Sequence, residues 1–242
     1  MNNFLFFIEI MNKFVKLQII NLIKLKGSKM KKIFIAILFS LFTFSQASAE
    51  LGVNVGIAGN LGLFAASAKE EAGETHKGSE HGAAGWASVF VEKSFGDKFA
   101  IGVDYVPDAL ESETTETSKQ DKDGSATPTS RTNSVQVDFE DLTTLYVNIN
   151  LTDSMYVRAG LVKVDVITNE SLGTGATYGN TDLDGQTLGF GTNMEMDNGV
   201  FVRAEANYMT FDSSGGLISG DNTITLTNLD GVTASLKIGK SF

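Results

Sequence analysis

Eight stretches of the chain alternate between apolar residues and small or polar residues with a period of two. In the first stretch, 51–64, the odd-numbered positions are mostly aliphatic, whereas the even-numbered positions from Gly52 to Gly62 are Gly, Asn and Ala. Successive side chains of a β-strand point to opposite faces, so this period predicts strands. The other predicted strands cover about 84–95, 99–106, 135–151, 155–162, 187–196, 200–208 and 233–242.

The connections between these strands alternate between long and short. Three-residue turns are predicted at 96–98, 152–154 and 197–199, and Asn198-Gly199 readily supplies the positive φ that a tight turn needs. The long connections are polar, and we expect them to be solvated loops, at about 65–82, 107–134, 169–184 and 212–222. A membrane barrel sorts its connections in this way, because its two ends face different compartments.

The polar faces of the strands suit the interior of a narrow barrel. Small residues leave room there for larger side chains from opposite strands. These faces also carry charged residues: Glu92, Asp104, Glu140, Arg158, Glu195, Arg203, Glu205 and Lys237. A soluble core would bury these charges at high cost, whereas in a small barrel they can pair across the lumen. We therefore predict an all-β fold, a closed eight-stranded antiparallel up-and-down transmembrane β-barrel, over a soluble sandwich or barrel.

The strand at 84–95 is ambiguous in phase. The favoured phase points Glu92 into the lumen and places four residues against lipid: Ala87, Val89, Val91 and Phe95. The competing phase exposes Trp86 and Phe90 to lipid but takes Glu92 with them. A second irregularity follows Val162, where the alternation blurs, and we interpret it as a bulge near the rim.

Asp141 shares the phase of the predicted lipid-facing residues Leu145 to Leu151. A strand tilted by about 45° climbs about 2.3 Å per residue, which places Asp141 roughly 23 Å above Leu151. This height is near the top of an apolar band about 25 Å tall. We expect Asp141 at the outer headgroup level, with residues 135–140 projecting above it.

Residues 30–49 have the three parts of a secretory signal. Two lysines form the basic start, residues 33–44 form the apolar middle, and a small-residue cleavage site follows with Ala47 and Ala49. The apolar run is shorter than the roughly 20 residues that a transmembrane helix needs. We therefore predict a signal peptide that is cleaved.

Residues 1–29 precede this signal and carry no cap or turn pattern, so we predict that translation begins at Met30 and that 1–29 is a misplaced-start extension. The mature domain is then 50–242, with 12 basic and 28 acidic residues and a net charge of −16. This charge excludes a basic nucleic-acid footprint. The absence of cysteine excludes disulfides and thiolate metal sites, and we expect no cofactor.

Two acidic segments contain residue types that can bind metal ions. His76 and His81 stand among glutamates, but their spacing fits no defined metal motif, so a solvated acidic loop is favoured. Asp121-Lys-Asp123-Gly124 is similar to part of a calcium loop but lacks the later ligands, notably a Glu at position twelve. Because no serine is fixed beside the histidines on a strand, we also predict that the protein is not an enzyme.

The predicted lumen contains a charged cluster of Arg158, Arg203 and Glu205. Such a cluster could gate a narrow pore, or it could fill and stiffen the lumen. Filling is favoured, because eight strands enclose only enough space for side chains.

The last strand ends with Leu236-Lys-Ile-Gly-Lys-Ser-Phe242. With the signal and the eight alternating strands, this ending resembles the eight-stranded outer-membrane β-barrel family of opacity proteins, OmpA-type transmembrane domains and OmpW-like proteins. The resemblance implies that Leu236, Ile238 and Phe242 form the signal that the insertion machinery recognises. Lys240 departs from the family's pattern, and snorkelling near the headgroups would accommodate it.

We therefore expect a monomer in the outer membrane of a Gram-negative bacterium, with both mature termini in the periplasm. Its expected partners are outer-membrane lipid and lipopolysaccharide, the insertion machinery and periplasmic chaperones. The first functional hypothesis is a structural or surface-interaction protein with long acidic loops. The second, which the OmpW-like resemblance implies, is a minor porin or small-solute pore.

Overall fold

The computed structural model describes residues 52–72, 74–121, 129–172, 177–213, 216–219 and 222–242. The predicted extension at 1–29 and the predicted signal at 30–49, including Ala47 and Ala49, lie outside the described residues. In the part of the chain that is described, no helix is long and apolar enough to cross a membrane.

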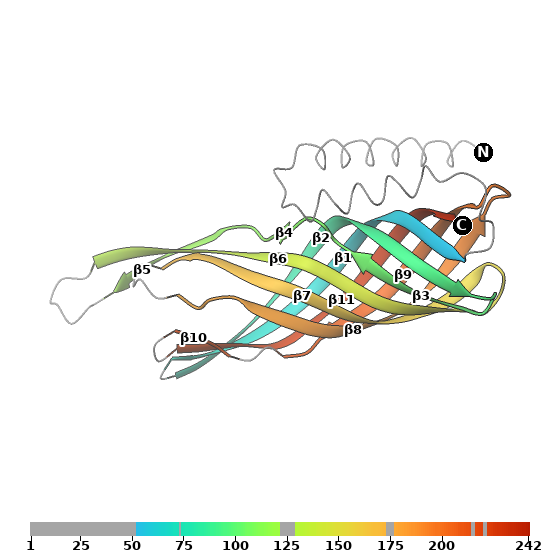
Figure 1. Cartoon of the computed structure of the whole chain (residues 1–242). Helices are drawn as coiled ribbons and strands as arrows, with labels where there is room; N and C mark the ends of the chain where they lie inside the picture. Colours follow the sequence, from blue (N-terminus) through green and yellow to red (C-terminus); the bar gives the residue numbers. More distant parts are fainter. Residues whose placement is uncertain (1–51, 73, 122–128, 173–176, 214–215, 220–221) are drawn as a thin grey trace, which may run out of the picture. The chain divides into compact units, whose positions relative to one another are not determined.

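All described strands belong to one antiparallel sheet that closes on itself (Figure 1). The strands are β1 (Val53–Ala72), β2 (Glu74–Phe95), β3 (Phe99–Tyr105), β4 (Leu110–Glu111), β5 (Thr115–Asp121), β6 (Thr129–Asn150), β7 (Met155–Ser171), β8 (Thr181–Glu195), β9 (Val200–Phe211), β10 (Leu217–Ser219) and β11 (Asn222–Ser241).

Eight strands form the wall of the barrel, in the order β1-β2-β3-β6-β7-β8-β9-β11. The first and last strands pair with each other, from Asn54 opposite Ser241 to Glu71 opposite Thr223. This closure leaves no open edge around the wall. The predicted eight-stranded up-and-down barrel is therefore confirmed.

Three tight turns lie together at one end of the barrel, which we call the turn end. They join β2 to β3, β6 to β7 and β8 to β9, at the predicted positions. Gly96 and Gly199 have φ of 61° and 77°, a region that glycine adopts without steric cost. The beginning of β1 lies at the same end, because Asn54 pairs with Ser241 at the end of β11.

At the opposite end the strands are much longer than predicted. The predicted loop at 65–82 continues the β1–β2 hairpin, with Ser67 opposite Ser79 and Glu71 opposite Thr75. Part of the predicted loop at 107–134 is also strand, because β4 and β5 pair with β6. Polar composition does not prevent a hairpin from extending, since each added pair continues to satisfy backbone hydrogen bonds.

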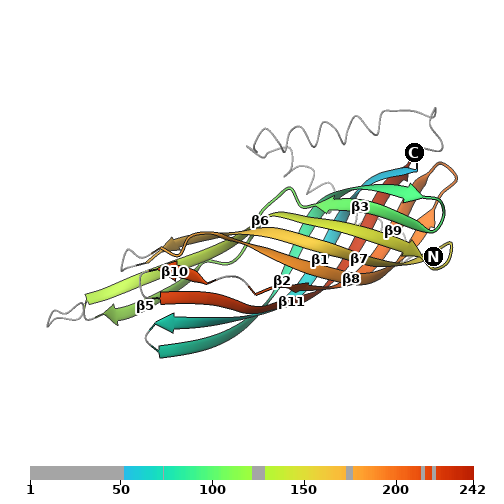
Figure 2. The same ribbon diagram turned by 60° about the horizontal axis from the view of Figure 1, so that its bottom comes forward.

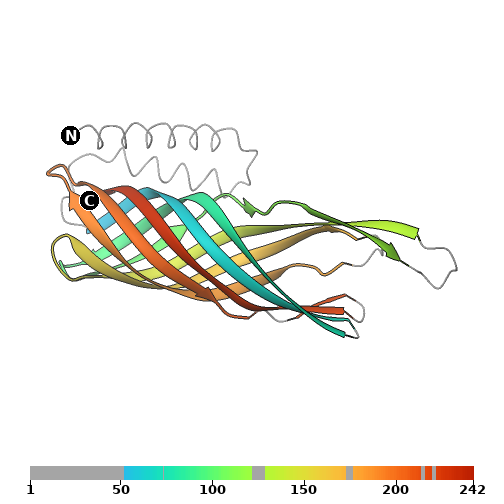
Figure 3. The same cartoon turned by 180° about the vertical axis from the view of Figure 1, so that it is seen from behind.

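These extensions form two arms that diverge beyond the barrel (Figures 1 and 2). The first arm contains the outer parts of β2, β1 and β11 together with β10, and the second contains β5, β6 and β7. The wall divides here because β2 pairs with β3 only from Val89 to Phe95. The view from behind shows the same division (Figure 3).

The favoured phase of β2 is the observed one. Trp86, Phe90 and Glu92 are buried in the lumen, whereas Val91 and Phe95 are exposed on the outer surface. Phe95 stacks on Phe99 across the first tight turn, with ring centroids 5.1 Å apart.

A β-bulge in β6 reverses which side chains of that strand face inward. Glu140 pairs with Asp165 and Thr143 pairs with Lys163, so Asp141 and Leu142 together oppose a single residue of β7. Asp141 has φ of 52°, the left-handed region that aspartate tolerates better than most residues. Its exposed side chain accepts a hydrogen bond from the Tyr105 hydroxyl at 2.5 Å.

The bulge corrects two expectations from the sequence. The phase of β6 is not continuous, because Leu142 is buried below the bulge while Phe139 packs inward above it. The irregularity predicted after Val162 lies on the neighbouring strand instead. In β7 itself the inward phase runs unbroken, since Val162, Val164 and Val166 are all buried.

The polarity of both barrel faces inverts along β7. The outward face changes from apolar Leu161 to Lys163, and the inward face changes from Arg158 to Val162. Outward charges also follow the apolar positions on other strands, at Asp141, Asp184 and Asp230. At about 2.3 Å per residue these positions lie roughly 18–25 Å from the turn end, close to the height of a lipid-facing band.

Candidate functional site

Glu92 is the centre of a polar network in the half of the lumen nearest the turn end. Its side chain is 1 % exposed, and the two guanidinium nitrogens of Arg203 donate to its two oxygens at 2.9 and 3.0 Å. Asn54 Nδ2 and Asn148 Nδ2 each donate to it at 2.8 Å. Asn54 lies directly opposite Glu92 on the adjacent strand β1. Because β6 and β9 do not adjoin β2 in the wall, the hydrogen bonds from Asn148 and Arg203 cross the lumen.

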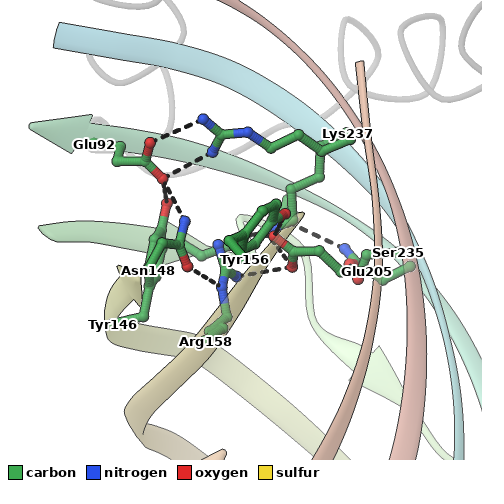
Figure 4. Close-up of polar contacts among 12 residues, drawn as sticks. Glu92, Tyr146, Asn148, Tyr156, Arg158, Glu205, Ser235 and Lys237 are labelled. Carbon is green, nitrogen blue, oxygen red and sulfur yellow. Dashed lines mark hydrogen bonds and ion pairs between the residues drawn. The ribbon is translucent and has the colours of Figure 1, made fainter. Parts of the chain in front are cut away.

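Glu205 is the centre of a second cluster (Figure 4). Lys237 Nζ lies 3.0 Å and Arg158 Nη1 lies 3.1 Å from its Oε2. The Tyr156 hydroxyl donates to Oε1. Lys237 Nζ also lies 3.1 Å from Asp104 Oδ2 on β3, so this cluster too spans the lumen.

Asn148 connects the two clusters. Its amide donates to Glu92, and its Oδ1 accepts a hydrogen bond from Arg158 Nε at 3.0 Å. The Arg158 guanidinium also stacks on the Tyr146 ring, 3.6 Å from the centroid. We call this network the polar plug; it contains Asn54, Glu92, Asp104, Tyr146, Asn148, Tyr156, Arg158, Arg203, Glu205 and Lys237.

Glycines make room for the aromatic rings of the lumen. Tyr146 stands directly opposite Gly102, and Tyr156 directly opposite Gly191. A Cβ on either glycine would lie 2.5 Å from the facing tyrosine ring. Gly56 opposite Phe90 has the same arrangement. The small inward residues seen in the sequence thus accommodate large side chains of adjacent strands.

The structure places six of the eight predicted lumen residues in the polar plug. Glu140 is excluded, because the bulge at Asp141 turns it to the exposed outer side. Glu195 occupies an inward register position but pairs with Phe201 beside the last tight turn, where its side chain is exposed. A prediction from alternation alone takes no account of register shifts or of the distance between a residue and the end of the barrel.

The sequence predicts the inward face for two neutral members of the plug, Asn54 and Tyr156, but it does not single out Tyr146 and Asn148. The available signal was their even spacing on strands whose odd positions are aliphatic. What could not be inferred is which of these side chains meet across the lumen.

The other half of the lumen is apolar. We call its core the apolar plug: Trp86, Val106, Leu142, Val162, Val164, Val166, Leu183, Met209, Phe211 and Leu229. These residues come from six wall strands and the segment after β3. They pack as a soluble core packs, while the outer face of the same region carries Lys163 paired with Asp182 at 2.7 Å.

The structure also places residues of the predicted insertion signal and of the two acidic segments. Leu236 and Ile238 lie on the outward face of β11, and Phe242 directly follows that strand. His81 is exposed, and the tip of the calcium-like segment lies outside the described residues. Among the described side chains, no group of three His, Cys, Asp or Glu could hold a metal ion. The polar plug pairs buried charges across the lumen.

Solved structures with a similar fold include outer-membrane proteins of several kinds. OprG of Pseudomonas aeruginosa matches with a TM-score of 0.43 and 11 % identity over 81 % of this chain and 99 % of that chain. The attachment invasion locus protein Ail of Yersinia pestis gives 0.37 and 10 % over 77 % and 99 %. The outer membrane protease OmpT of Escherichia coli gives 0.44 and 10 % over 83 % and 99 %.

A comparison with curated protein sequences finds no match. The profile of the family described as "Outer membrane protein beta-barrel domain" matches residues 34–239, most of the chain. The closed antiparallel barrel, its apolar outer band and its polar lumen agree with that match. The chain therefore belongs to the outer-membrane β-barrel domain family.

Proposed function

We propose that this protein is a non-conducting structural barrel that displays two strand arms at the cell surface for interaction with other molecules. The observation that carries the proposal is the double closure of the lumen. The polar plug fills the half nearest the turn end, and the apolar plug fills the half nearest the arms. An eight-stranded barrel has little interior space beyond its own side chains.

The polar plug supports closure because its charges are mutually neutralised. Glu92 is paired with Arg203, and Glu205 with Arg158 and Lys237. Moving Arg203 aside would leave Glu92 buried without a counter-charge, at a cost of about 3–5 kcal/mol, and moving Glu205 aside would leave Arg158 without its carboxylate partner. Such a network is a stable filling rather than an easily displaced gate.

The arms support the interaction role. They continue the barrel hairpins well past the level at which the outward face becomes charged, so they would stand in water. Their residues include exposed acidic side chains such as Glu71, Glu80, Glu111 and Glu116. A pair of acidic arms suits the recognition of other surfaces better than the passage of solutes.

The expected orientation puts the turn end and both mature termini in the periplasm and the arms outside. Short periplasmic turns and long external connections are the usual asymmetry of such barrels. The expected partners remain outer-membrane lipid and lipopolysaccharide, together with the insertion machinery and periplasmic chaperones. A monomer is expected, and neither a cofactor nor an enzymatic activity is proposed.

Single-channel recording of the purified protein in planar bilayers tests this function. We expect no stable openings from the native protein. Stable openings whose ion selectivity changes in Arg203→Ala would instead establish a minor porin, the competing function. Lys163→Ala is the matched control, because Lys163 lies on the outer surface, and its loss should leave any openings unchanged.

A further inference from the structure

A small cavity lies in the lumen between the two plugs. Its volume is about 30 Å³. Its wall includes Asp104, Arg158 and Lys237 of the polar plug and Val106 and Met209 of the apolar plug. The cavity therefore occupies the level at which the lumen changes from polar to apolar.

Three residues that line the cavity each carry a buried polar atom with no hydrogen-bond partner among the described residues. The atoms are Arg158 Nη2, Asn207 Oδ1 and Thr233 Oγ1. Their residues are 5 %, 8 % and 5 % exposed, so bulk water does not reach them freely. Buried polar groups are nearly always hydrogen-bonded, because leaving one unpaired costs its full desolvation.

The chemistry of these three atoms selects the class of ligand. Arg158 Nη2 can only donate, Asn207 Oδ1 can only accept, and the Thr233 hydroxyl can do either. An anion would pair with the arginine, but it would require the Asn207 amide to turn its Nδ2 toward the cavity. The two cations at the wall are already paired with carboxylates, so the site has little net charge to attract an ion.

We infer that this cavity binds ordered water, which joins Arg158, Asn207 and Thr233 and completes the polar plug. A cavity of this size has room for about two water molecules. The bound water holds Arg158 in place between Glu205 and the Tyr146 ring. The inference rests on the closed lumen proposed above, since an open pore would exchange this water rapidly.

Water–protein cross-relaxation in solution NMR tests the site directly in the folded, full-length mature barrel. We expect the backbone amides of Asn207 and Thr233 to show contacts with the sign of long-lived bound water. The same measurement in Thr233→Val removes the hydroxyl that could relay magnetisation, and the contact at Asn207 should persist. Native protein without such contacts would overturn the inference.

The stability of Thr233→Val gives an independent test, because its sign depends on whether water is bound. With water bound, the variant loses a hydrogen bond and its urea midpoint falls. With an empty cavity, the variant removes an unsatisfied hydroxyl and the midpoint rises. Thr187→Val is the matched control, because Thr187 lines the same cavity but donates to the Tyr208 carbonyl at 3.2 Å, so its midpoint falls in either case.

Two further outcomes separate this inference from its alternatives. A midpoint that depends on replacing chloride with bromide or fluoride would identify an anion site and overturn the water assignment. A conducting barrel with rapidly exchanging water would overturn both the closed lumen and the bound water. A silent barrel in which Thr233→Val raises the midpoint would overturn the bound water alone.

Discussion

The two halves of the lumen are built on opposite principles. In the half nearest the turn end, charged and amide side chains fill the interior and aliphatic residues cover the outside. In the half nearest the arms, the interior is an apolar cluster and the outside carries charge. Five of the wall strands, β2, β6, β7, β9 and β11, contribute to both halves, so neither the strand nor its pairing explains the difference.

The solvent around the wall explains the difference between the two halves of the lumen. Where lipid surrounds the wall, apolar side chains are as stable on the outer face as in the lumen. The lumen can therefore be polar if every charge is paired. Where water surrounds the wall, burying apolar surface again stabilises the fold, and the interior becomes a conventional core. The inversion near Lys163 therefore marks the expected outer boundary of the lipid band.

The largest effect is expected from breaking the polar plug. Arg203→Met leaves Glu92 buried beside Asn54 and Asn148 without a cation, and we expect the free energy of unfolding to fall by about 3–5 kcal/mol. Urea titration in lipid vesicles measures this loss. The double variant Glu92→Gln/Arg203→Met should lose less than the single variant; an equal or larger loss would show that charge pairing does not organise this half.

The apolar plug should be destabilised by truncation of a buried side chain rather than by the loss of a charge pair. Leu183→Ala removes a side chain that is 3 % exposed, and we expect a loss of about 2–5 kcal/mol in the free energy of unfolding. Leu188→Ala is the matched control on the same strand, because Leu188 is 65 % exposed toward the lipid side. If both variants unfolded at the same urea concentration, this half would not act as a core.

Crowding at the glycines should affect the polar half specifically. Gly102→Ala places a Cβ 2.5 Å from the Tyr146 ring, and overpacking of this kind costs about 1–3 kcal/mol. Gly82→Ala is the matched control in the first arm, because nothing lies within 4 Å of its would-be Cβ. Thermal unfolding in detergent compares the two; similar midpoints would mean that Tyr146 yields without strain.

The smallest effect is expected at the bulge that separates the two halves of β6. A β-branched residue tolerates the φ of 52° at Asp141 poorly, so Asp141→Val should cost about 1–2 kcal/mol. Asp141→Gly removes the steric conflict and should remain closer to the native stability in the same urea titration. A stable, native-like Asp141→Val protein would argue that the bulge relaxes into a regular strand.

Much of the fold could be predicted from residue periodicity. The eight wall strands, the three tight turns and the inward position of Glu92 follow from the alternation and from the short polar turns between strands, two of which contain Gly. The lengths of the arms could not be predicted. Residues 65–82 and 115–121 have a loop-like composition, and their strand structure depends on partners that extend the ladder from the barrel.

The candidate site was predictable residue by residue but not as a network. The alternation predicts an inward side chain for Glu140 and Glu195 as it does for Glu92 and Glu205. Glu140, however, lies beyond a bulge, and Glu195 lies at the exposed end of the wall. The pairing of Glu92 with Arg203 depends on barrel closure, because the two residues are 111 positions apart.

The sequence by itself determined the class of fold and, for most of the strands, the side that faces outward. The reason is that alternation with period two is a local property, which every strand expresses before it meets a partner. Only the tertiary structure decided which charges pair, where the lumen turns apolar, and that three polar atoms are left around a small cavity. Those features arise from distances across a closed ring, which no single strand contains.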